Sequence, residues 1–335
     1  MRVLVIKTSS LGDVVHTLPA LTDARRAIPG IRFDWVVEEG FAEIPAWHPA
    51  VESVIPVAIR RWRKAPLRTW RSGEWSTFRQ RLAAGGYDLA IDAQGLLKSA
   101  WLTRYVKAPV AGLDRHSARE PLASCFYDRR YPVPVEQHAL ERVRQLFAQA
   151  LGYSLDGAPP ADYGLDRRRL AGGSAAQPYL LFLHGTTWPS KHWPEEHWRA
   201  LAEQVTAAGW ALRLPWGNAA ERARAERIAE GLPDADVLPR LNLAGVAAQI
   251  AGARACVAVD TGLGHLAAAL GVPSISLYGP TRPGRVGAYG PSQVHLCASG
   301  PNAGSGDRHK PAFEGLGPER VMTELQRLLQ TQESA

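Results

Sequence analysis

The sequence begins MRVLVIKTSSLGD (residues 1–13), and this stretch decides the fold class. Residues 2–6 predict a strand, because Val3-Leu4-Val5-Ile6 is a continuous apolar run, which is typical of a strand buried on both faces of a parallel sheet. A short polar loop follows at 7–13, and the apolar spacing of residues 14–27 then predicts a helix. A buried strand, a loop and a helix in this order indicate the first half of a βαβ unit.

Predicted strands and helices alternate along the rest of the chain. In the first half we expect strands at 33–37, 54–57 and 89–92, and helices at 96–106 and 134–150. In the second half we expect strands at 179–184, 211–215, 256–259 and 274–277. The helices of that half are expected at 195–208, 219–230, 243–252, 264–270 and 318–331. Strands that alternate with helices of about 10–15 residues favour parallel sheets.

The length of 335 residues predicts two domains, since domains usually have about 100–200 residues. Glycine, proline, serine and alanine dominate parts of residues 156–177, which we interpret as the linker. We therefore expect an α/β chain of two doubly wound, Rossmann-like domains, at 1–160 and 177–317. The C-terminal helix, 318–335, is considered as packing back on the first domain. Parallel sheets bind ligands at the carboxyl ends of their strands, so we expect the domains to face each other across one cleft.

The composition points to an anionic partner. The net charge is +7 and the pI is about 9.5, which favours nucleic acid, a phosphorylated lipid or a nucleotide. Three widely spaced cysteines are interpreted as thiols in a reducing compartment. The initial apolar run ends at Lys7, too short for a signal peptide or a membrane span. We expect a cytoplasmic protein, and contact with a membrane surface stays open.

The loop after the first strand carries Asp13, and two interpretations stand side by side. Asp is a preferred helix N-cap, which would make the residue structural. A carboxylate at the tip of a strand is also a candidate general base, with a pKa kept low by the helix N-terminus. Such a weak base accepts a proton late, from a hydroxyl that has begun to attack. Gly12 would leave room for a close turn or a close ligand.

The loop at 184–194 links a predicted strand to a predicted helix. Thr186, Thr187 and Lys191 suit a phosphate at a helix N-terminus. The motif GxxxxGK[ST] is absent, so the loop is not a P-loop. The alternative interpretation is a tryptophan-rich surface loop without a ligand.

A third loop, VDTGLGHL at 259–266, opens a helix of small residues. Gly262 and Gly264 let a ligand approach the backbone, and the free N–H groups of a helix start favour a pyrophosphate. His265 either donates to a phosphate or belongs to the core. The dinucleotide fingerprint GxGxxG is missing after the first strand, which disfavours an NAD enzyme.

One acidic triplet, Asp234-Ala235-Asp236, has the form that binds a divalent metal in some sugar transferases. It stands beside Pro233 after a predicted helix, and we interpret it as a solvated turn. No other cluster of Asp, Glu or His has metal-ligand spacing, so we expect a reaction without metal or another cofactor.

Basic residues alternate with tryptophans at 60–71, in a predicted loop of the first half. This pattern fits nucleic acid, the carboxylates and phosphates of an acidic glycolipid, or a solvated run of charge. His138 and Arg142 are four residues apart on a predicted helix and would share one face, where they extend an anion site or are solvated.

The chain resembles the lipopolysaccharide heptosyltransferases, which use ADP-heptose. The resemblance is carried by residues 1–19, by Thr186-Thr187 with Lys191-His192-Trp193-Pro194, and by Asp260-Thr261-Gly262-Leu263-Gly264-His265. These motifs lie in both halves in the order that the family has them. Residues 59–64 and 92–99 favour type I of the family over type II.

The resemblance implies a GT-B fold and an inverting reaction without metal. The donor would be ADP-L-glycero-β-D-manno-heptose, and the acceptor the 5-hydroxyl of the first Kdo of Kdo2-lipid A. The enzyme would then be peripheral on the cytoplasmic face of the inner membrane, with no nucleic-acid partner.

The resemblance also implies roles for single residues. Asp13 would be the general base, and Lys191 would neutralise the departing diphosphate. The remaining donor residues would be Thr186, Thr187, Glu221, Leu241, Asp260, Thr261, Gly262 and His265. Leu241 stands where some members have Met, a mild departure because both side chains are apolar. Acceptor-binding candidates are Lys7, Ser10, Arg60, Arg61, Arg63, Lys64 and His138.

Two alternatives remain open at this point. One is heptosyltransferase II or a related transferase with another acceptor. The other is a non-catalytic protein that binds nucleic acid through the basic segment, which would give steeply salt-dependent binding and no role for Asp13.

Overall fold

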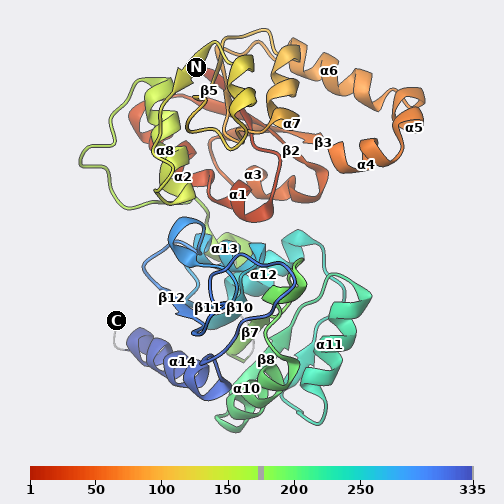
Figure 1. Cartoon of the computed structure of the whole chain (residues 1–335), viewed down its shortest axis with the longest axis vertical. Helices are drawn as coiled ribbons and strands as arrows, with labels where there is room; N and C mark the ends of the chain where they lie inside the picture. The colour runs from red at the N-terminus through yellow and green to blue at the C-terminus, as the bar shows by residue number, and fades with distance from the viewer. Residues whose placement is uncertain (173–176, 334–335) are drawn as a thin grey trace. The chain divides into compact units, whose positions relative to one another are not determined.

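The computed structural model describes residues 1–172 and 177–333 (Figure 1). It divides into two compact units, Met1–Leu165 and Asp166–Ala335, and each is described by itself. Both units contain a six-stranded sheet in which all neighbouring strands are parallel. The run Gly172-Gly173-Ser174-Ala175-Ala176 that we interpreted as linker lies, after its first residue, outside the described residues.

The sheet of the first unit has the strand order β3-β2-β1-β4-β5-β6. Its strands are β1 (Arg2–Ile6), β2 (Arg32–Glu38), β3 (Val51–Val57), β4 (Leu89–Asp92), β5 (Val110–Leu113) and β6 (Arg129–Tyr131). The chain reverses its direction of winding between β1 and β4, and ligands of doubly wound sheets bind at this switch point. The loop 7–13 therefore lies where the fold class places a site.

The helices of the first unit connect these strands. They are α1 (Leu11–Val15), α2 (Leu18–Ala27), α3 (Glu43–Ala46), α4 (Ile59–Lys64), α5 (Pro66–Arg71), α6 (Glu74–Ala84), α7 (Leu97–Ala100) and α8 (Ala139–Leu151). The 3-10 helices are η1 (Glu39–Phe41), η2 (Trp101–Tyr105) and η3 (Pro121–Phe126). Figure 1 shows α4, α5 and α6, in orange, extending to one side of this unit.

Three predictions for the first unit are wrong in detail. The helix expected at 14–27 is split, because Pro19 has no N–H and stands in the first turn of a new helix, α2. The basic segment 60–71 is not a loop but forms α4 and α5. The helix expected from residue 134 begins only at Ala139, with His138 as its N-cap.

The sheet of the second unit has the order β12-β11-β10-β7-β8-β9. Its strands are β7 (Tyr179–Leu183), β8 (Ala211–Leu214), β9 (Ala235–Val237), β10 (Ala255–Val259), β11 (Ser274–Tyr278) and β12 (Gln293–Cys297). Its helices are α9 (Arg167–Ala171), α10 (Glu195–Ala207), α11 (Ala219–Ala229), α12 (Leu243–Gly252), α13 (Gly262–Ala269) and α14 (Pro318–Glu333), with η4 (Pro189–Lys191) and η5 (Pro283–Arg285). Here the switch point lies between β7 and β10.

The last helix, α14, packs within the second unit. Val321, Leu325 and Leu329 recur every four residues on one face and join the core around Trp198 and Leu201 of α10. Its apolar face is thus covered by α10 and the second sheet. The expectation that this helix also packs back on the first domain stays a prediction.

The interpretation of the triplet Asp234-Ala235-Asp236 is corrected in part by the fold. Asp234 lies in a turn after Pro233, as predicted, but Ala235 begins β9 and Asp236 pairs with Arg213 of β8, so the second half of the triplet is an edge strand. Both carboxylates are exposed. Among the helices of residues 1–172 and 177–333, none is both long enough and apolar enough to cross a membrane.

Candidate functional site

Asp13 lies in the loop between β1 and the first turn of α1. Its Oδ2 atom accepts hydrogen bonds from the backbone N–H of Ser10, at 2.8 Å, and from the Ser10 hydroxyl, at 2.9 Å. Ser10 is the N-cap of α1, and Asp13 is the third helical residue. The N-cap interpretation of Asp13 is therefore wrong. Its side chain is one-third exposed.

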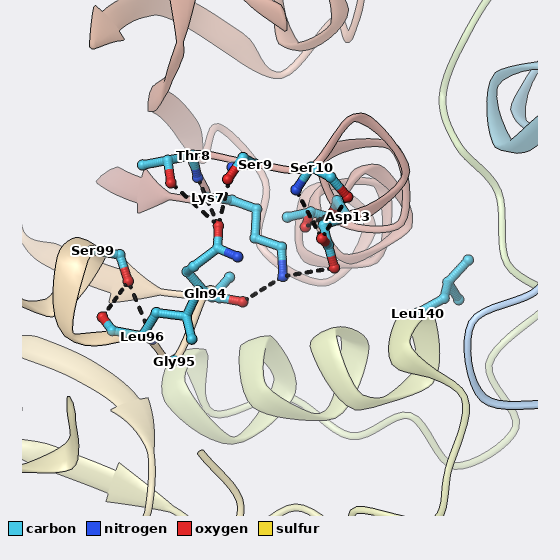
Figure 2. A network of polar contacts seen from close by, with 12 residues as sticks. Lys7, Thr8, Ser9, Ser10, Asp13, Gln94, Gly95, Leu96, Ser99 and Leu140 are labelled. Carbon is cyan, nitrogen blue, oxygen red and sulfur yellow. Dashed lines mark hydrogen bonds and ion pairs between the residues drawn. The ribbon is translucent and has the colours of Figure 1, made fainter. Parts of the chain in front are cut away.

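Lys7 approaches Asp13 from the end of β1, as Figure 2 shows. The Nζ atom of Lys7 donates to the carbonyl oxygen of Ala93, at 2.8 Å, and lies 3.9 Å from Oδ1 of Asp13. Burial lowers the pKa of Lys7 below its ordinary value of 10.5, and the charge of Asp13 opposes this shift. The carboxylate of Asp13 thus stabilises the charged form of the buried Lys7 side chain.

The electrostatic surroundings keep Asp13 ionised. Burial alone would raise the pKa of Asp13, but the charge of Lys7 and the hydrogen bonds from Ser10 outweigh it. The pKa therefore lies below its ordinary value of 3.8. A carboxylate of this kind is a weak base that is fully charged at neutral pH.

Gln94 fixes the backbone of the loop that carries these residues. Its Oε1 atom accepts from the N–H groups of Thr8, at 3.0 Å, and Ser9, at 3.1 Å (Figure 2). The residue follows β4, which is paired with β1 in the sheet. Two strand ends across the switch point are thus joined by one side-chain amide.

Asp92 in turn positions the backbone of Gln94 through a hydrogen bond. This fully buried carboxylate accepts from the backbone N–H of Gln94 at 2.8 Å, from the hydroxyl of Tyr127 at 2.8 Å and from that of Ser99 at 2.9 Å. Burial raises the pKa of Asp92, although these hydrogen bonds oppose the shift.

The sequence analysis missed Asp92, Gln94 and Tyr127 as parts of the site. A signal for the first two was present, because both are polar residues at the end of a predicted strand. Tyr127 comes from an unpredicted region between β5 and β6, and its hydroxyl reaches Asp92 only through the fold.

The basic candidates of the first unit are placed on α4. Arg60, Arg63 and Lys64 are exposed there. Arg61 is engaged by two carboxylates, since its guanidinium pairs with Glu39 at 3.0 Å and with Glu74 at 2.8 Å. Its charge is thus compensated in this conformation, which the charge pattern did not indicate.

Two further side chains border the loop of Asp13. The Nζ atom of Lys98, from α7, donates to the hydroxyl of Ser9 at 2.7 Å. His138 accepts from the N–H of Leu140 at 3.2 Å, and its ring lies edge-on to His16, with 5.1 Å between ring centroids. His16 directly follows α1, so the structure brings His138 beside the helix of Asp13.

In the second unit, Lys191 and Asp260 form an ion pair with 2.6 Å between Nζ and Oδ2. Lys191 ends η4 in the loop after β7, and Asp260 directly follows β10. The hydroxyl of Thr281 also donates to Oδ2 of Asp260, at 2.7 Å, and that of Thr186 donates to the Asp260 carbonyl, at 3.2 Å. Predicted donor residues from two loops therefore meet at the switch point.

The start of α13 adjoins this pair. Thr261 is the N-cap, with extended backbone, and Gly262 is the first helical residue. A Cβ at Gly264 would lie 3.4 Å from the Cβ of Ala258, which is an ordinary contact distance, so this part of the helix faces β10 directly. His265 is buried on the helix. The first N–H groups of α13 are suited to a phosphate.

Glu221 and Leu241 lie around the same strand ends. Glu221, in the first turn of α11, accepts from the N–H of Gly217 at 2.7 Å. A Cβ at Gly185 would lie 2.9 Å from the Glu221 carboxyl carbon, so the loop after β7 passes close to this acid. Thr187 is exposed, and Leu241 is half-buried immediately before the N-cap of α12.

The indole of Trp188, in the loop after β7, is contacted by two cations. The Nζ atom of Lys191 lies 4.3 Å from the centroid of the Trp188 ring, and the Arg308 guanidinium lies 4.4 Å from it. Trp188 is thus packed between two cations, which disfavours the interpretation of a plain surface loop.

Comparisons with known proteins agree with this arrangement. The model of glycosyltransferase family 9 (heptosyltransferase) matches residues 75–313. Lipopolysaccharide heptosyltransferase 1 of Pseudomonas aeruginosa is 64% identical, with 98% of both chains covered. The protein of that name in Escherichia coli K12 is 55% identical over 88% of this chain and 92% of its own length.

Solved structures give the same result. E. coli heptosyltransferase WaaC with ADP has a TM-score of 0.90 and 50% identity, covering 98% of this chain and 100% of that one. E. coli ADP-heptose lps heptosyltransferase II has a TM-score of 0.79 over 99% of this chain and 100% of its own. At 22% identity the latter shows the fold alone.

The chain belongs to glycosyltransferase family 9, the heptosyltransferases, and is a glycosyltransferase. Its similarity to the heptosyltransferases 1 assigns it to lipopolysaccharide core biosynthesis and confirms the predicted resemblance to type I. The predicted α/β fold with two doubly wound domains of GT-B type is also confirmed.

Proposed function

We propose that the enzyme transfers L-glycero-D-manno-heptose from ADP-heptose to the 5-hydroxyl of the first Kdo of Kdo2-lipid A, with inversion. The observation that supports this most directly is the setting of Asp13, a partly exposed carboxylate held by Ser10 beside Lys7 at a strand end. The E. coli relative solved with ADP-2-deoxy-2-fluoro heptose, 49% identical to this chain, supports the donor.

Asp13 is proposed as the general base. The acceptor oxygen forms a bond to the anomeric carbon while the bond from that carbon to the diphosphate breaks. The proton of the hydroxyl passes to Asp13, and ADP departs with both electrons of the broken bond. Because the pKa of Asp13 is low, the proton moves late, when the attacking oxygen has already become acidic.

The second unit is proposed to hold ADP-heptose. The diphosphate would lie against the first N–H groups of α13, with Thr186, Thr187, Thr261, Gly262 and His265 as its polar contacts. Lys191 would share its charge between Asp260 and the departing phosphate, which stabilises the charge that develops on ADP. Asp260 would face the heptose, Glu221 the ribose, and Leu241 the adenine.

The first unit is proposed to hold the acceptor. Lys7, Ser10, Arg60, Arg63, Lys64 and His138 are its candidate contacts, and Arg61 would have to leave Glu39 and Glu74 to take part. An acceptor rich in carboxylate and phosphate suits these cations. The enzyme would then work in peripheral contact with the cytoplasmic face of the inner membrane.

The reaction is proposed to need no metal, because the lysine and the helix N-terminus supply the positive charge that a metal otherwise provides. Activity should therefore survive EDTA unchanged. Loss of activity in EDTA, restored by a divalent cation, would reject this part and direct attention to Asp234 and Asp236.

The decisive assay offers ADP-heptose with either Kdo2-lipid A or the same acceptor already carrying one heptose. We expect a mass increase of one heptose on the first acceptor alone. Transfer only to the heptosylated acceptor would reject type I specificity in favour of type II. Absence of transfer to both would reject the proposed acceptor altogether.

A further inference from the structure

Helices α4 and α5, residues 59–71, expose large apolar side chains in a basic setting, and we call them the α4–α5 arm. Leu67 and Trp70 are each 77% exposed. They are three residues apart on α5 and therefore share one face of the helix. Exposed apolar residues that gather in one place mark interaction surfaces, whereas single ones are ordinary.

Exposed apolar side chains are also found next to the arm. Leu97 and Trp101, at the starts of α7 and η2, are also among the large apolar residues exposed in the described part of the chain. An apolar groove of about 670 Å³ runs beside them, lined among others by Trp62, Trp70, Trp75 and Phe126. This volume lies within the roughly 300–1,000 Å³ typical of ligand sites.

The base of the groove is ordered. Trp75 stacks on Trp101 at 5.3 Å and contacts Trp62 edge-on at 5.6 Å between centroids. The indole N–H of Trp62 donates to Glu74 at 2.9 Å. These contacts attach the arm to α6 and η2, and Trp70 and Leu67 are exposed on its surface.

The charge of the arm is entirely positive. Residues 59–71 contain six cationic side chains and no acid: Arg60, Arg61, Arg63, Lys64, Arg68 and Arg71. Arg61 is neutralised by Glu39 and Glu74. For the other five, no carboxylate of residues 1–172 or 177–333 lies within ion-pair distance.

An apolar groove alone would suit many partners, but here exposed apolar side chains are combined with basic ones, and this combination favours one kind of partner. Tryptophan favours the boundary between lipid headgroups and acyl chains, and basic residues are attracted to anionic headgroups. We propose that the α4–α5 arm docks on the surface of an anionic lipid bilayer, with Trp70 and Leu67 inserted among the chains. This rests on the proposed function, since a lipid acceptor places the enzyme at such a surface.

The location of the arm fits this proposal. The groove is also lined by Lys98, whose Nζ atom contacts Ser9 in the loop of Asp13. A bilayer bound at the arm would thus adjoin the loop that carries the proposed base. The polar headgroup of a lipid held in that bilayer near Lys98 would then lie close to the candidate acceptor residues of this loop.

The test measures binding of the full chain to vesicles that contain no acceptor. Flotation is compared for vesicles of phosphatidylcholine and for vesicles with phosphatidylglycerol added. The variants are Trp70→Asp, Trp70→Phe and Arg68→Glu, and the matched control is Val286→Asp, which changes an exposed apolar residue of the second unit.

We expect wild type to bind the anionic vesicles and to release them as salt rises from about 50 mM to about 500 mM. Trp70→Asp and Arg68→Glu should weaken binding at least tenfold, whereas Trp70→Phe and Val286→Asp stay within threefold. Equal binding to both vesicle types, or an unchanged affinity in Trp70→Asp, would overturn the proposal. A third set of vesicles contains Kdo2-lipid A, and binding of wild type to this set alone would overturn the proposal too.

A second measurement separates this inference from the proposed function. Heptose transfer is assayed without vesicles, on an acceptor stripped of its acyl chains and free in solution. Trp70→Asp should keep wild-type turnover there, which also shows that the variant is folded. If wild type transfers nothing to this acceptor or to Kdo2-lipid A, the proposed function fails, whatever the vesicle result.

Discussion

The Nζ atom of Lys191 lies 2.6 Å from the Oδ2 atom of Asp260, and this pair joins the loops that follow β7 and β10. Both side chains are largely buried, so each charge compensates the other. Removing one partner of such a pair leaves an uncompensated charge in a poorly solvated place. A bound diphosphate would add a second anion within reach of the same lysine.

The first prediction concerns this lysine. Lys191→Ala should lower kcat by about 10²–10³, the usual cost of one lost donor to a developing charge. Steady-state kinetics with ADP-heptose measures the change. The control is Lys310→Ala, an exposed lysine of the same unit. A kcat within threefold of wild type in Lys191→Ala would contradict the proposed role.

A second prediction addresses the proposed base. Asp13→Asn preserves the shape and an acceptor for the N–H of Ser10, but cannot take a proton, so kcat should fall by about 10²–10⁴. The exposed Asp156→Asn serves as control. In wild type that remains folded, the fall of kcat that reports protonation of Asp13 should lie below pH 3.8, because the pKa of Asp13 lies under that value. A decline centred near pH 6.5 would instead indicate a histidine base.

The third prediction tests Gln94 as a positioning residue. Gln94→Leu removes the oxygen that receives the N–H groups of Thr8 and Ser9, so the loop of Asp13 loosens. We expect kcat to fall about tenfold, as a small displacement of a catalytic group is costly.

A merely structural role for Gln94 would leave the pH profile in place. Since Ser10 and Lys7 keep the pKa of Asp13 low, a loosened loop should move the acid limb of kcat upward. The exposed Gln149→Leu is the control, and an unaltered profile together with unaltered kcat would refute the assignment.

A fourth prediction concerns the pH dependence of stability. His48 is buried, its Nδ1 atom accepts from the N–H of Ala50, and Nε2 bonds the Thr22 hydroxyl. Burial and the charge of Arg25 lower its pKa from 6.5 to about 4. The unfolded chain therefore binds the proton first, and stability falls as the pH drops from 6.5 towards 4.

The size of this effect follows from linkage, at about 3 kcal/mol once the pH reaches the folded pKa. Urea unfolding of the first unit at several pH values measures it. In His48→Gln, the loss of unfolding free energy between pH 6.5 and pH 4 should be smaller than in wild type by that amount. The variant itself is expected to be less stable than wild type at pH 7. An identical slope in both proteins would contradict the assignment.

The fifth prediction concerns the ion pair between α2 and α8. Arg144 and Asp23 are buried with 2.6 Å between Nε and Oδ2. Asp23→Ala should destabilise the first unit by about 3–5 kcal/mol, because the guanidinium would remain buried with reduced compensation. Glu324→Ala, which breaks the exposed pair with Arg327, should cost less than about 1 kcal/mol. Equal shifts of the unfolding midpoint would contradict this reasoning.

Periodicity predicted the strands on both sides of each switch point, β1 and β4 in the first sheet and β7 and β10 in the second. The strands at Arg2–Ile6 and Leu89–Asp92 have the predicted bounds, because continuous apolar runs between polar loops have few other interpretations. Four strands were missed: β5, β6, β9 and β12. Of these, β6 and β9 have only three residues each, too few to give a clear apolar pattern. The helices α4 and α5 were missed because charge dominates their composition.

The candidate site was predictable where it depends on loops that follow strands. Asp13, Lys191 and Asp260 were identified from that position and from the family resemblance. The partners of these residues were not predictable, because the contacts of Gln94 with Thr8 and of Lys191 with Asp260 join residues that are far apart in the sequence. Such contacts follow from the strand order, which periodicity alone does not give.

Numbered from its first strand, each sheet has the order 3-2-1-4-5-6, so the two units repeat one topology. The proposed donor residues belong to one repeat and the proposed acceptor residues to the other. Loops after β7 and β10 can therefore mutate without disturbing the strand ends at β1 and β4. Over evolutionary time, preference for the sugar nucleotide and preference for the acceptor can diverge separately, so new pairings of donor and acceptor can arise from one ancestral gene.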